Sequence, residues 1–157
     1  MMIGIISDTH GLLRPEACER LAGVDHIIHA GDIGAPEILE QLKALAPVSA
    51  VRGNNDSGRW ARSVPVKVNL ELEGVTIHVV HDLGELDART TARVVISGHS
   101  HKPVIRENDG VLYVNPGSAG PRRFKLPIAV GELTIDGNVV SARIVRLDGD
   151  VAARANG

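Results

Sequence analysis

The chain has 157 residues, a length that suits one domain with one hydrophobic core. Its hydrophobic fraction of 43% and charged fraction of 23% exclude a disordered or fibrous protein. The formal net charge of -2 and the presence of only one Trp, one Tyr and one Phe argue against a nucleic-acid-binding surface. We therefore do not expect nucleic acid as a partner.

Cysteine content and hydropathy bear on the compartment. Cys18 is the only cysteine, which excludes an internal disulfide and fits a reducing environment. No stretch reaches the roughly 20 consecutive apolar residues that cross a bilayer. The first residues, Met-Met-Ile-Gly-Ile-Ile, carry no basic leader and read as a strand rather than a signal peptide. We predict a cytoplasmic protein without a membrane partner.

The first third of the chain alternates predicted strands with predicted helices. Apolar strands are expected at residues 2–7, 24–30 and 48–51. Helices are expected between them, from Pro15 to Gly23 and from Pro36 to Leu45, because proline suits a first helical position and the apolar residues keep helical spacing. This alternation predicts a parallel sheet with functional groups at the carboxyl ends of its strands.

The remainder of the chain is predicted to be mostly strand. The alternating segment 67–73 and the apolar run 75–80 read as a hairpin turning at Gly74, and further strands are expected at 94–98, 111–114, 128–135 and 139–147, the last two joined by an Asp136-Gly137 turn. Early helices and late hairpins predict two sheets packed face to face with helices outside. We expect residues 1–157 to form a single domain without a cap, and residues 148–157 to form a frayed tail.

Side chains that bind metals follow five of the predicted strands. Two neighbouring histidines also occur in ordinary loops, but the same strand-then-ligand pattern repeated five times is improbable for packing alone. Two divalent ions account for the set, and imidazole and amide groups favour manganese first, then nickel, zinc or iron, over magnesium or calcium. The predicted ligands are Asp8, His10, Asp32, Asn54, His81, His99 and His101.

The order of these motifs resembles the calcineurin-like metallophosphoesterases. The five segments that carry the resemblance are Asp8-Thr9-His10, Gly31-Asp32, Gly53-Asn54, His81 and Gly98-His99-Ser100-His101. The match runs from residue 1 to about residue 120, and residues 115–118 resemble a segment of the small, single-domain microbial phosphodiesterases of this family. The resemblance implies an α/β fold, a four-layer αββα sandwich of two mixed β-sheets flanked by helices.

The resemblance also implies roles for the predicted ligands. One metal is expected to be held by Asp8, His10, Asp32 and His101, and the other by Asp32, Asn54, His81 and His99, with Asp32 as the bridge. A hydroxide bridging the two ions would then attack phosphorus in line. The expected reaction is hydrolysis of small phosphodiesters, and of phosphomonoesters as an extension.

The chain departs from the family pattern at two places. Many members have histidine directly after Gly-Asn, where this chain has Asn55, which cannot act as a general acid near neutral pH. We therefore expect good leaving groups to be preferred, with Asn54, Asn55, Asp56 and His81 as the catalytic candidates. Asp56 either orients a neighbour or stabilises its loop. Asp82 follows His81, where the family often has glycine and another histidine.

Several alternatives stay open from the sequence. A non-catalytic scaffold subunit, like one in the eukaryotic retromer, is the rival function, and a nuclease is less favoured. The chain could form a homo-oligomer, either a dimer or a tetramer. Arg122 and Arg123 could bind phosphate or lie on a solvated face, whereas we interpret His26, His29 and His78 as structural.

Overall fold

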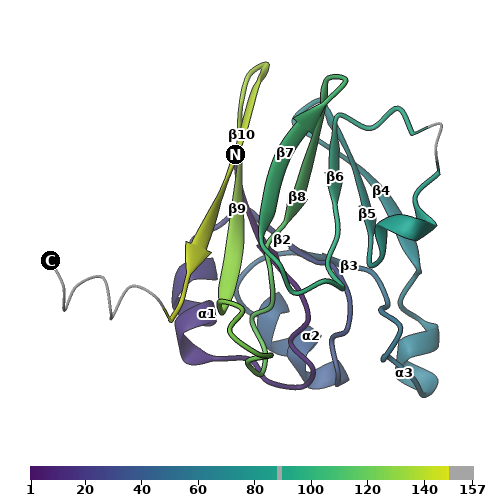
Figure 1. Cartoon of the computed structure of the whole chain (residues 1–157), viewed down its shortest axis with the longest axis vertical. Helices are drawn as coiled ribbons and strands as arrows, with labels where there is room; N and C mark the ends of the chain where they lie inside the picture. The colour runs from purple at the N-terminus through teal and green to yellow at the C-terminus, as the bar shows by residue number, and fades with distance from the viewer. Residues whose placement is uncertain (88–89, 149–157) are drawn as a thin grey trace, which may run out of the picture.

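Two five-stranded sheets pack face to face in the structure, a computed structural model that describes residues 1–87 and 90–148 (Figure 1). Sheet A has the order β10-β9-β1-β2-β3 and contains β1 (Met2–Ile6), β2 (His26–His29), β3 (Val48–Ala50), β9 (Ala129–Asp136) and β10 (Val139–Arg146). Sheet B has the order β4-β5-β6-β8-β7 and contains β4 (Lys67–Leu72), β5 (Val75–Val80), β6 (Val94–Ile96), β7 (Val104–Asn108) and β8 (Val111–Asn115). The predicted two-sheet sandwich is confirmed, and apart from Asp148 the predicted tail lies outside the described residues.

Both sheets are mixed, and three neighbouring strands in each run parallel. In sheet A, β1 pairs in parallel with β2 and β2 with β3, while β9 joins β1 antiparallel. In sheet B, β5 pairs in parallel with β6 and β6 with β8. The carboxyl ends of these six parallel strands point to the lower edge of the molecule in Figure 1. This edge carries the segments on which the predicted ligands lie.

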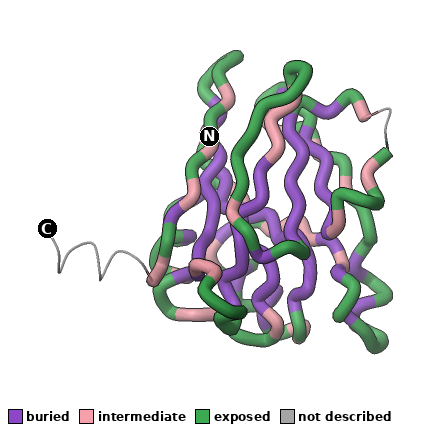
Figure 2. The backbone as a smooth tube through the Cα atoms, in the orientation of Figure 1, coloured by how far each residue is buried: buried purple, intermediate pink, exposed green. Residues whose placement is uncertain are grey.

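Two apolar layers hold the sandwich together, and Figure 2 shows the inner strands, among them β1, β5, β6 and β9, buried along most of their length. Ile3 and Ile5 of β1 pack between the sheets, whereas Ile6 faces the helices on the other side. Burial on both faces explains why β1 and β2 read as continuous apolar runs instead of alternating ones. The strands of sheet A are therefore fixed from both sides.

The helices lie mainly on the outer face of sheet A. Both α1 (Pro15–Leu21) and α2 (Pro36–Lys43) begin with proline, as predicted, and pack their buried side chains against that face. The outer face of sheet B is bordered by the segment that contains the 3-10 helix η1 (Leu83–Glu85). Among the described residues no helix has the length and apolar content needed to cross a membrane.

The structure adds elements that were not predicted. Strand β7 is an exposed edge strand whose Val-Ile-Arg-Glu-Asn sequence has no buried run to reveal it. The turn between β7 and β8 could have been predicted from its Asp-Gly pair. Asp109 and Gly110 have left-handed φ values of 51° and 76°, as this type of hairpin turn requires. The helix α3 (Arg59–Arg62) is too short for periodicity to show. The β9–β10 turn is residues 137–138, one residue later than predicted.

Candidate metal centre

Sharp turns at the strand ends place the predicted ligands. Five of them are non-glycine residues in the left-handed region, where an L-residue costs about 1 kcal/mol and where such strain concentrates at functional sites. Asp and His are among the residue types that tolerate this conformation best. The φ values are 56° at Asp8, 47° at His10, 54° at Asp32, 73° at His99 and 62° at His101.

Glycines allow the loops to approach one another closely. A Cβ atom on Gly98 would lie 2.0 Å from Oγ of Ser7, which is far inside van der Waals contact. A Cβ atom on Gly53 would lie 2.2 Å from the backbone nitrogen of Asp32. Glycine is therefore needed directly before His99 and Asn54, because a side chain at Gly98 or Gly53 would collide with another ligand loop.

Asp8 has one carboxylate oxygen held by the protein and one left without a hydrogen bond. Its Oδ2 accepts from the hydroxyl of Ser7 at 2.6 Å and from the backbone N–H of His99 at 3.1 Å. Its Oδ1 is buried and accepts no hydrogen bond from residues 1–87 and 90–148, although it lies 3.8 Å from Nε2 of His10 and 3.4 Å from Nε2 of His101. A buried oxygen of this kind needs a partner, and a cation between the three side chains would supply it.

Asp32 lies between the two halves of the site. Asn55 donates to both of its oxygens, from the backbone nitrogen at 2.8 Å and from the side-chain amide at 3.0 Å. Oδ2 of Asp32 lies 3.8 Å from Nε2 of His10 and 3.3 Å from Nε2 of His81. Burial alone would raise the pKa of Asp32, but the hydrogen bonds from His81 and Asn55 bring that pKa well below its usual value. The carboxylate is therefore charged and can contact cations on either side.

His81 and Asn54 form the other half of the site. His81 donates from Nδ1 to the carbonyl oxygen of Ala30 at 2.7 Å, which turns Nε2 toward the centre. Oδ1 of Asn54 lies 3.1 Å from that Nε2 and 3.2 Å from Nδ1 of His99. Burial opposes a charge on His81, but contacts with Asp32 and Ala30 raise its pKa to about 9. In the metal-free protein a proton therefore occupies a position that a cation would take.

The predicted ligands converge on one place in two overlapping groups. Ligand atoms of Asp8, His10 and His101 lie within 4.8 Å of one another, and so do those of Asp8, Asp32 and His81. The structure separates His99 from His101, the former beside Asn54 and the latter beside Asp8. Imidazole, carboxylate and amide donors together fit a transition metal.

Asp56 has a different position from the other catalytic candidates. Its carboxylate accepts backbone N–H groups from Ile33 at 3.1 Å, Gly34 at 2.9 Å and Gly53 at 2.9 Å. These contacts tie the loop after β2 to the loop after β3. Of the two roles that the sequence left open for Asp56, this geometry supports the loop-stabilising one.

Other polar residues that the sequence did not single out support the ligand loops. Asn115 donates from its side chain to the carbonyl oxygen of Gly98 at 2.9 Å and to Oγ of Ser100 at 3.1 Å. Ser118 donates to the carbonyl oxygen of Asp8 at 3.0 Å. The sequence signal was present in the Asn-Pro-Gly-Ser segment, but the partners became visible only in the fold.

Asp82 also approaches a predicted ligand. Its Oδ2 lies 3.9 Å from Nε2 of His99, the ring nitrogen that faces away from Asn54, and its Oδ1 accepts from the backbone N–H of Gly84 at 3.0 Å. A carboxylate beyond a metal-binding imidazole orients the ring and raises its basicity. Asp82 can serve His99 in this way.

His29, beneath the ligand loops, is a structural residue. It donates from Nε2 to the Thr9 hydroxyl at 3.0 Å, and the Gly31 N–H donates to its Nδ1 at 3.1 Å. Burial, the larger cause, and the nearby charge of His81 lower the pKa of His29 to about 3. The ring is therefore neutral, and its two hydrogen bonds brace the turns that carry Asp8 and Asp32.

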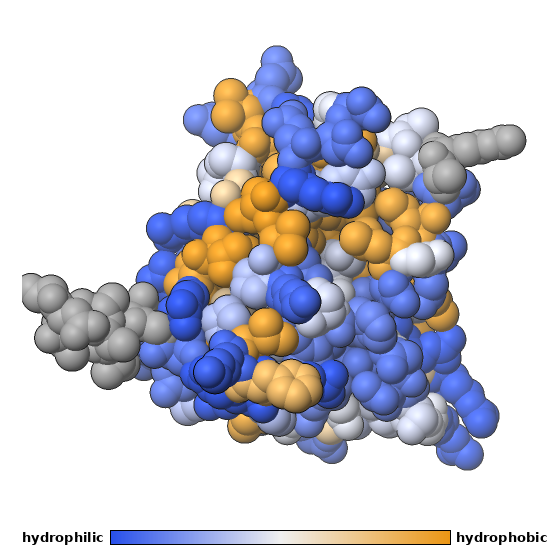
Figure 3. All heavy atoms as spheres, in the orientation of Figure 1, coloured by the Kyte–Doolittle hydropathy of each residue, from blue (hydrophilic) through white to orange (hydrophobic). Residues whose placement is uncertain are grey.

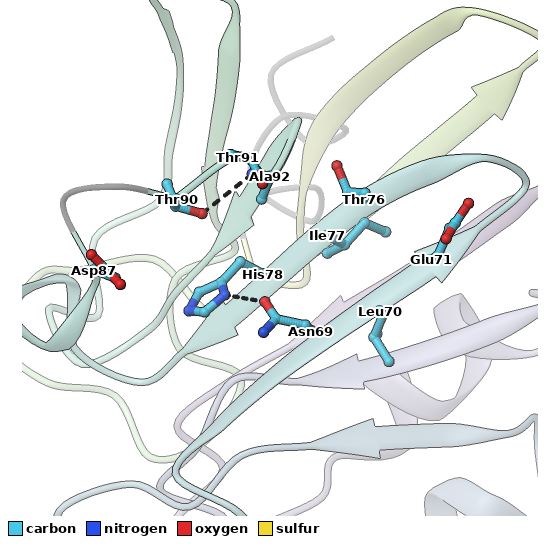
Figure 4. A pocket seen from close by; sticks show the side chains of 10 residues that line it. All are labelled: Asn69, Leu70, Glu71, Thr76, Ile77, His78, Asp87, Thr90, Thr91 and Ala92. Carbon is cyan, nitrogen blue, oxygen red and sulfur yellow. Dashed lines mark hydrogen bonds between the residues drawn. The ribbon is translucent and has the colours of Figure 1, made fainter.

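His78 lies away from the candidate centre, on the outer face of sheet B. Figure 4 shows it in a pocket with Asn69, to which its Nδ1 is hydrogen-bonded, and with Asp87 across from the ring. Nε2 of His78 is buried and has no hydrogen-bond partner among the residues that the structure describes. The hydrogen bond from Nδ1 to Asn69 agrees with a structural role for His78, but such a role does not account for Nε2.

Comparison with known proteins agrees with the geometry. Residues 1–138 match the Calcineurin-like phosphoesterase superfamily domain. A protein of Methanothermobacter thermautotrophicus named "Probable metallophosphoesterase" is 37% identical over 171 aligned positions, which cover 99% of this chain and 98% of that protein.

Solved structures share the fold. One described as a novel archaeal phosphodiesterase has a TM-score of 0.76 and 27% identity, covering 92% of this chain and 100% of its own. Vacuolar Protein Sorting 29 from Cryptosporidium parvum has a TM-score of 0.75 at 19% identity, covering 92% and 96%, which shows a common fold alone. On the match over residues 1–138 and the full-length archaeal relative, this chain belongs to the calcineurin-like phosphoesterase superfamily.

Proposed function

We propose that this protein is a metal-dependent phosphoesterase that hydrolyses small phosphodiesters at a centre for two divalent transition metals. The observation that carries the proposal is the buried Oδ1 of Asp8, which lacks a hydrogen bond and faces the imidazoles of His10 and His101. The relative named "Probable metallophosphoesterase" and the solved structure described as an archaeal phosphodiesterase support the reaction class.

The residues present suit two neighbouring ions. Asp8, His10 and His101 would hold one ion, and Asn54, His81 and His99 the other, with Asp32 shared because its carboxylate reaches both halves. When bound, the metals supply Lewis acidity that lowers the pKa of water and neutralises charge on the phosphoryl oxygens. Manganese is the first choice, and nickel, zinc or iron would suit the same donors.

Asn55 sets a limit on the chemistry. Its amide donates to Asp32, so it holds the shared carboxylate in place, and it has no proton to give to a leaving alkoxide. The protein should therefore favour substrates whose leaving groups depart as stable anions. We further propose that this domain has no cap over the site, which would leave the site open to substrates of varied shape.

The test uses protein loaded separately with manganese, nickel and zinc. We expect hydrolysis of bis(p-nitrophenyl) phosphate, with Asp32→Ala and His99→Ala losing at least about 100-fold in kcat, the scale on which a fixed charge or polarising group acts. Calorimetry with manganese gives a readout besides activity, since both variants should bind less metal. If metal-loaded protein leaves this activated diester intact, the proposal is wrong.

A non-catalytic scaffold is the second candidate, because Vacuolar Protein Sorting 29 shares the fold. The two functions differ in what they require at the strand ends. A scaffold does not require metal-binding side chains at all seven positions. In this chain every one of these positions has a residue that can bind a metal, and the side chains converge. Metal binding without any turnover of aryl phosphates would favour the scaffold.

A further inference from the structure

An open pocket of about 990 Å³ lies beside the candidate metal centre. One wall is Ser100, which sits between the predicted ligands His99 and His101 on a single loop. The other walls come from Lys102 and from the segment that follows β8, namely Arg123, Phe124, Lys125 and Leu126. A substrate held at the metals would thus extend into this pocket.

The pocket carries three positive charges. Within residues 1–87 and 90–148, Lys102, Arg123 and Lys125 form no ion pair, whereas the adjacent Arg122 is paired with Asp148. Arg123 and Ser100, the neighbour of His101 in the chain, line the same pocket. Three cations without acidic partners form a site for an anion.

Phe124 gives the pocket an aromatic element. It is the only Phe in the chain, and 88% of it is exposed. Its φ of 54° is left-handed, so the backbone is strained while the ring stays outside the core. Figure 3 shows the lower part of this face as mostly hydrophilic, with isolated apolar side chains among the polar ones. An exposed ring among cations offers a stacking surface for a planar group.

We propose that this pocket binds a nucleotide unit of the substrate, with a base against Phe124 and a second phosphate among Lys102, Arg123 and Lys125. The inference rests on the proposed function and names its substrate class: short phosphodiesters of nucleotides that carry a phosphate beyond the scissile one. Water attacks the scissile phosphorus, so one P–O bond forms and the bond to a ribose oxygen breaks. Because Asn55 has no proton to give, that oxygen takes its proton from solvent, and turnover should be slower than with an aryl diester. No oxidant or reductant is involved.

Size and charge favour a short substrate over a polymer. A volume near 1,000 Å³ is at the upper end of small-ligand pockets, enough for one nucleotide unit. The overall charge of -2 does not support a long track for a nucleic-acid backbone. The three cations are confined to this pocket at the edge of the site, where they would select for one additional anionic group.

The test compares three probes on manganese-loaded protein: the 5′-phosphorylated dinucleotide pApA, the dinucleotide ApA without that phosphate, and a phosphorylated dimer lacking its bases. We expect kcat/KM for pApA to exceed that for ApA by about tenfold, the scale of hydrogen bonds to a charged group. The Arg123→Ala/Lys125→Ala double variant should bring the ratio near one. Because the ratio is measured within one sample, partial misfolding cancels.

Phe124→Ala tests the aromatic element. Stacking on an aromatic ring stabilises a bound base, so this variant should lower kcat/KM for pApA about tenfold while the abasic dimer is little affected. Phe124→Tyr should restore the loss. Lys43→Ala, a surface cation on α2 paired with Glu40, is the matched control and should leave the pApA/ApA ratio unchanged.

The outcomes separate this inference from the proposed function. Failure to hydrolyse bis(p-nitrophenyl) phosphate overturns the function, whereas hydrolysis with a wild-type pApA/ApA ratio near one overturns the pocket assignment alone. A ratio unaffected by removal of Arg123 and Lys125 also overturns it. If Phe124→Ala lowers kcat/KM equally for pApA and for the abasic dimer, the pocket recognises an anion without a base, and the proposed substrate class is refuted.

Discussion

Oδ1 of Asp8 lies 3.4 Å from Nε2 of His101, and this buried oxygen accepts no hydrogen bond within the described part of the chain. A carboxylate so placed costs free energy unless a cation compensates it. Ser7 and the backbone of His99 fix the other oxygen, so Asp8 cannot turn away. This pair of residues therefore defines where the first metal would be bound.

Replacing Asp8 with Asn tests whether the negative charge of this side chain, and not its shape, is needed for metal binding. The variant keeps the size of the side chain and tolerates the left-handed backbone, but it removes the negative charge. Because losing even an outer partner of a ligand costs 10–100-fold in metal affinity, we expect a loss of at least about 100-fold here. Manganese titration calorimetry measures this, and unchanged affinity would show that Asp8 is not a ligand.

Asp82→Asn tests the carboxylate behind His99. We expect one of the two metal-binding steps to weaken about tenfold while the other is retained, since only one half of the site includes His99. Asp136→Asn changes an exposed residue at the end of β9, far along the chain from Asp82 and His99, and should weaken neither metal-binding step. Equal weakening of both steps would indicate a general loss of structure and not the orientation of one ring.

The metal-free protein should become less stable as pH rises. Contacts with Asp32 and Ala30 overcome burial and raise the pKa of His81 to about 9, whereas its unfolded value is 6.5. The folded chain holds the proton more tightly, so this stabilisation is complete below about pH 6.5 and is lost as pH rises through 9. Urea denaturation with a chelator, in wild type and His81→Gln, should show the decline only in wild type.

Metal binding should show the reverse dependence. A metal must displace the His81 proton, so its apparent affinity should rise by up to about tenfold per pH unit below pH 9. Proton release during manganese titration between pH 6 and 8 measures this directly. Release of no proton over that range would place His81 outside the metal site.

Gly98→Ala should disrupt the site through packing. The added Cβ would lie 2.0 Å from Oγ of Ser7 and 2.8 Å from Oδ2 of Asp8, so the loop must shift. Overpacking of this kind typically costs about 1–3 kcal/mol in folding stability, and we also expect weaker metal binding. Gly84→Ala, whose Cβ would make only ordinary contacts, is the control, and Ser7→Ala should rescue Gly98→Ala in part.

The convergence of the predicted ligands could be predicted because these residues obey a topological rule. Asp8, Asp32 and His81 each follow an apolar run, and parallel strands bring such positions to one edge. The rule uses only local patterns, so it works without knowledge of the tertiary fold. It could not show which oxygen of Asp8 is held by Ser7, because that contact depends on the approach of the Gly98 loop.

The misses have a common physical origin. Strand β7 is exposed at the edge of sheet B, so its pairing with β8 leaves little hydrophobic signal in the sequence. The contact between Asp82 and His99 joins residues from the ends of different strands. Each case depends on the environment of a side chain more than on its identity.

Five predicted ligands have a left-handed backbone, and this strain lowers the folding stability of the metal-free protein. A chain chosen for thermal robustness alone would put glycine at such positions, and His101→Gly should melt at a higher temperature than wild type when both are free of metal. Adding manganese should reverse that order, since only wild type can draw on binding energy. If the proposed ions bind, the sequence at these positions therefore gives up stability of the metal-free protein in exchange for metal affinity.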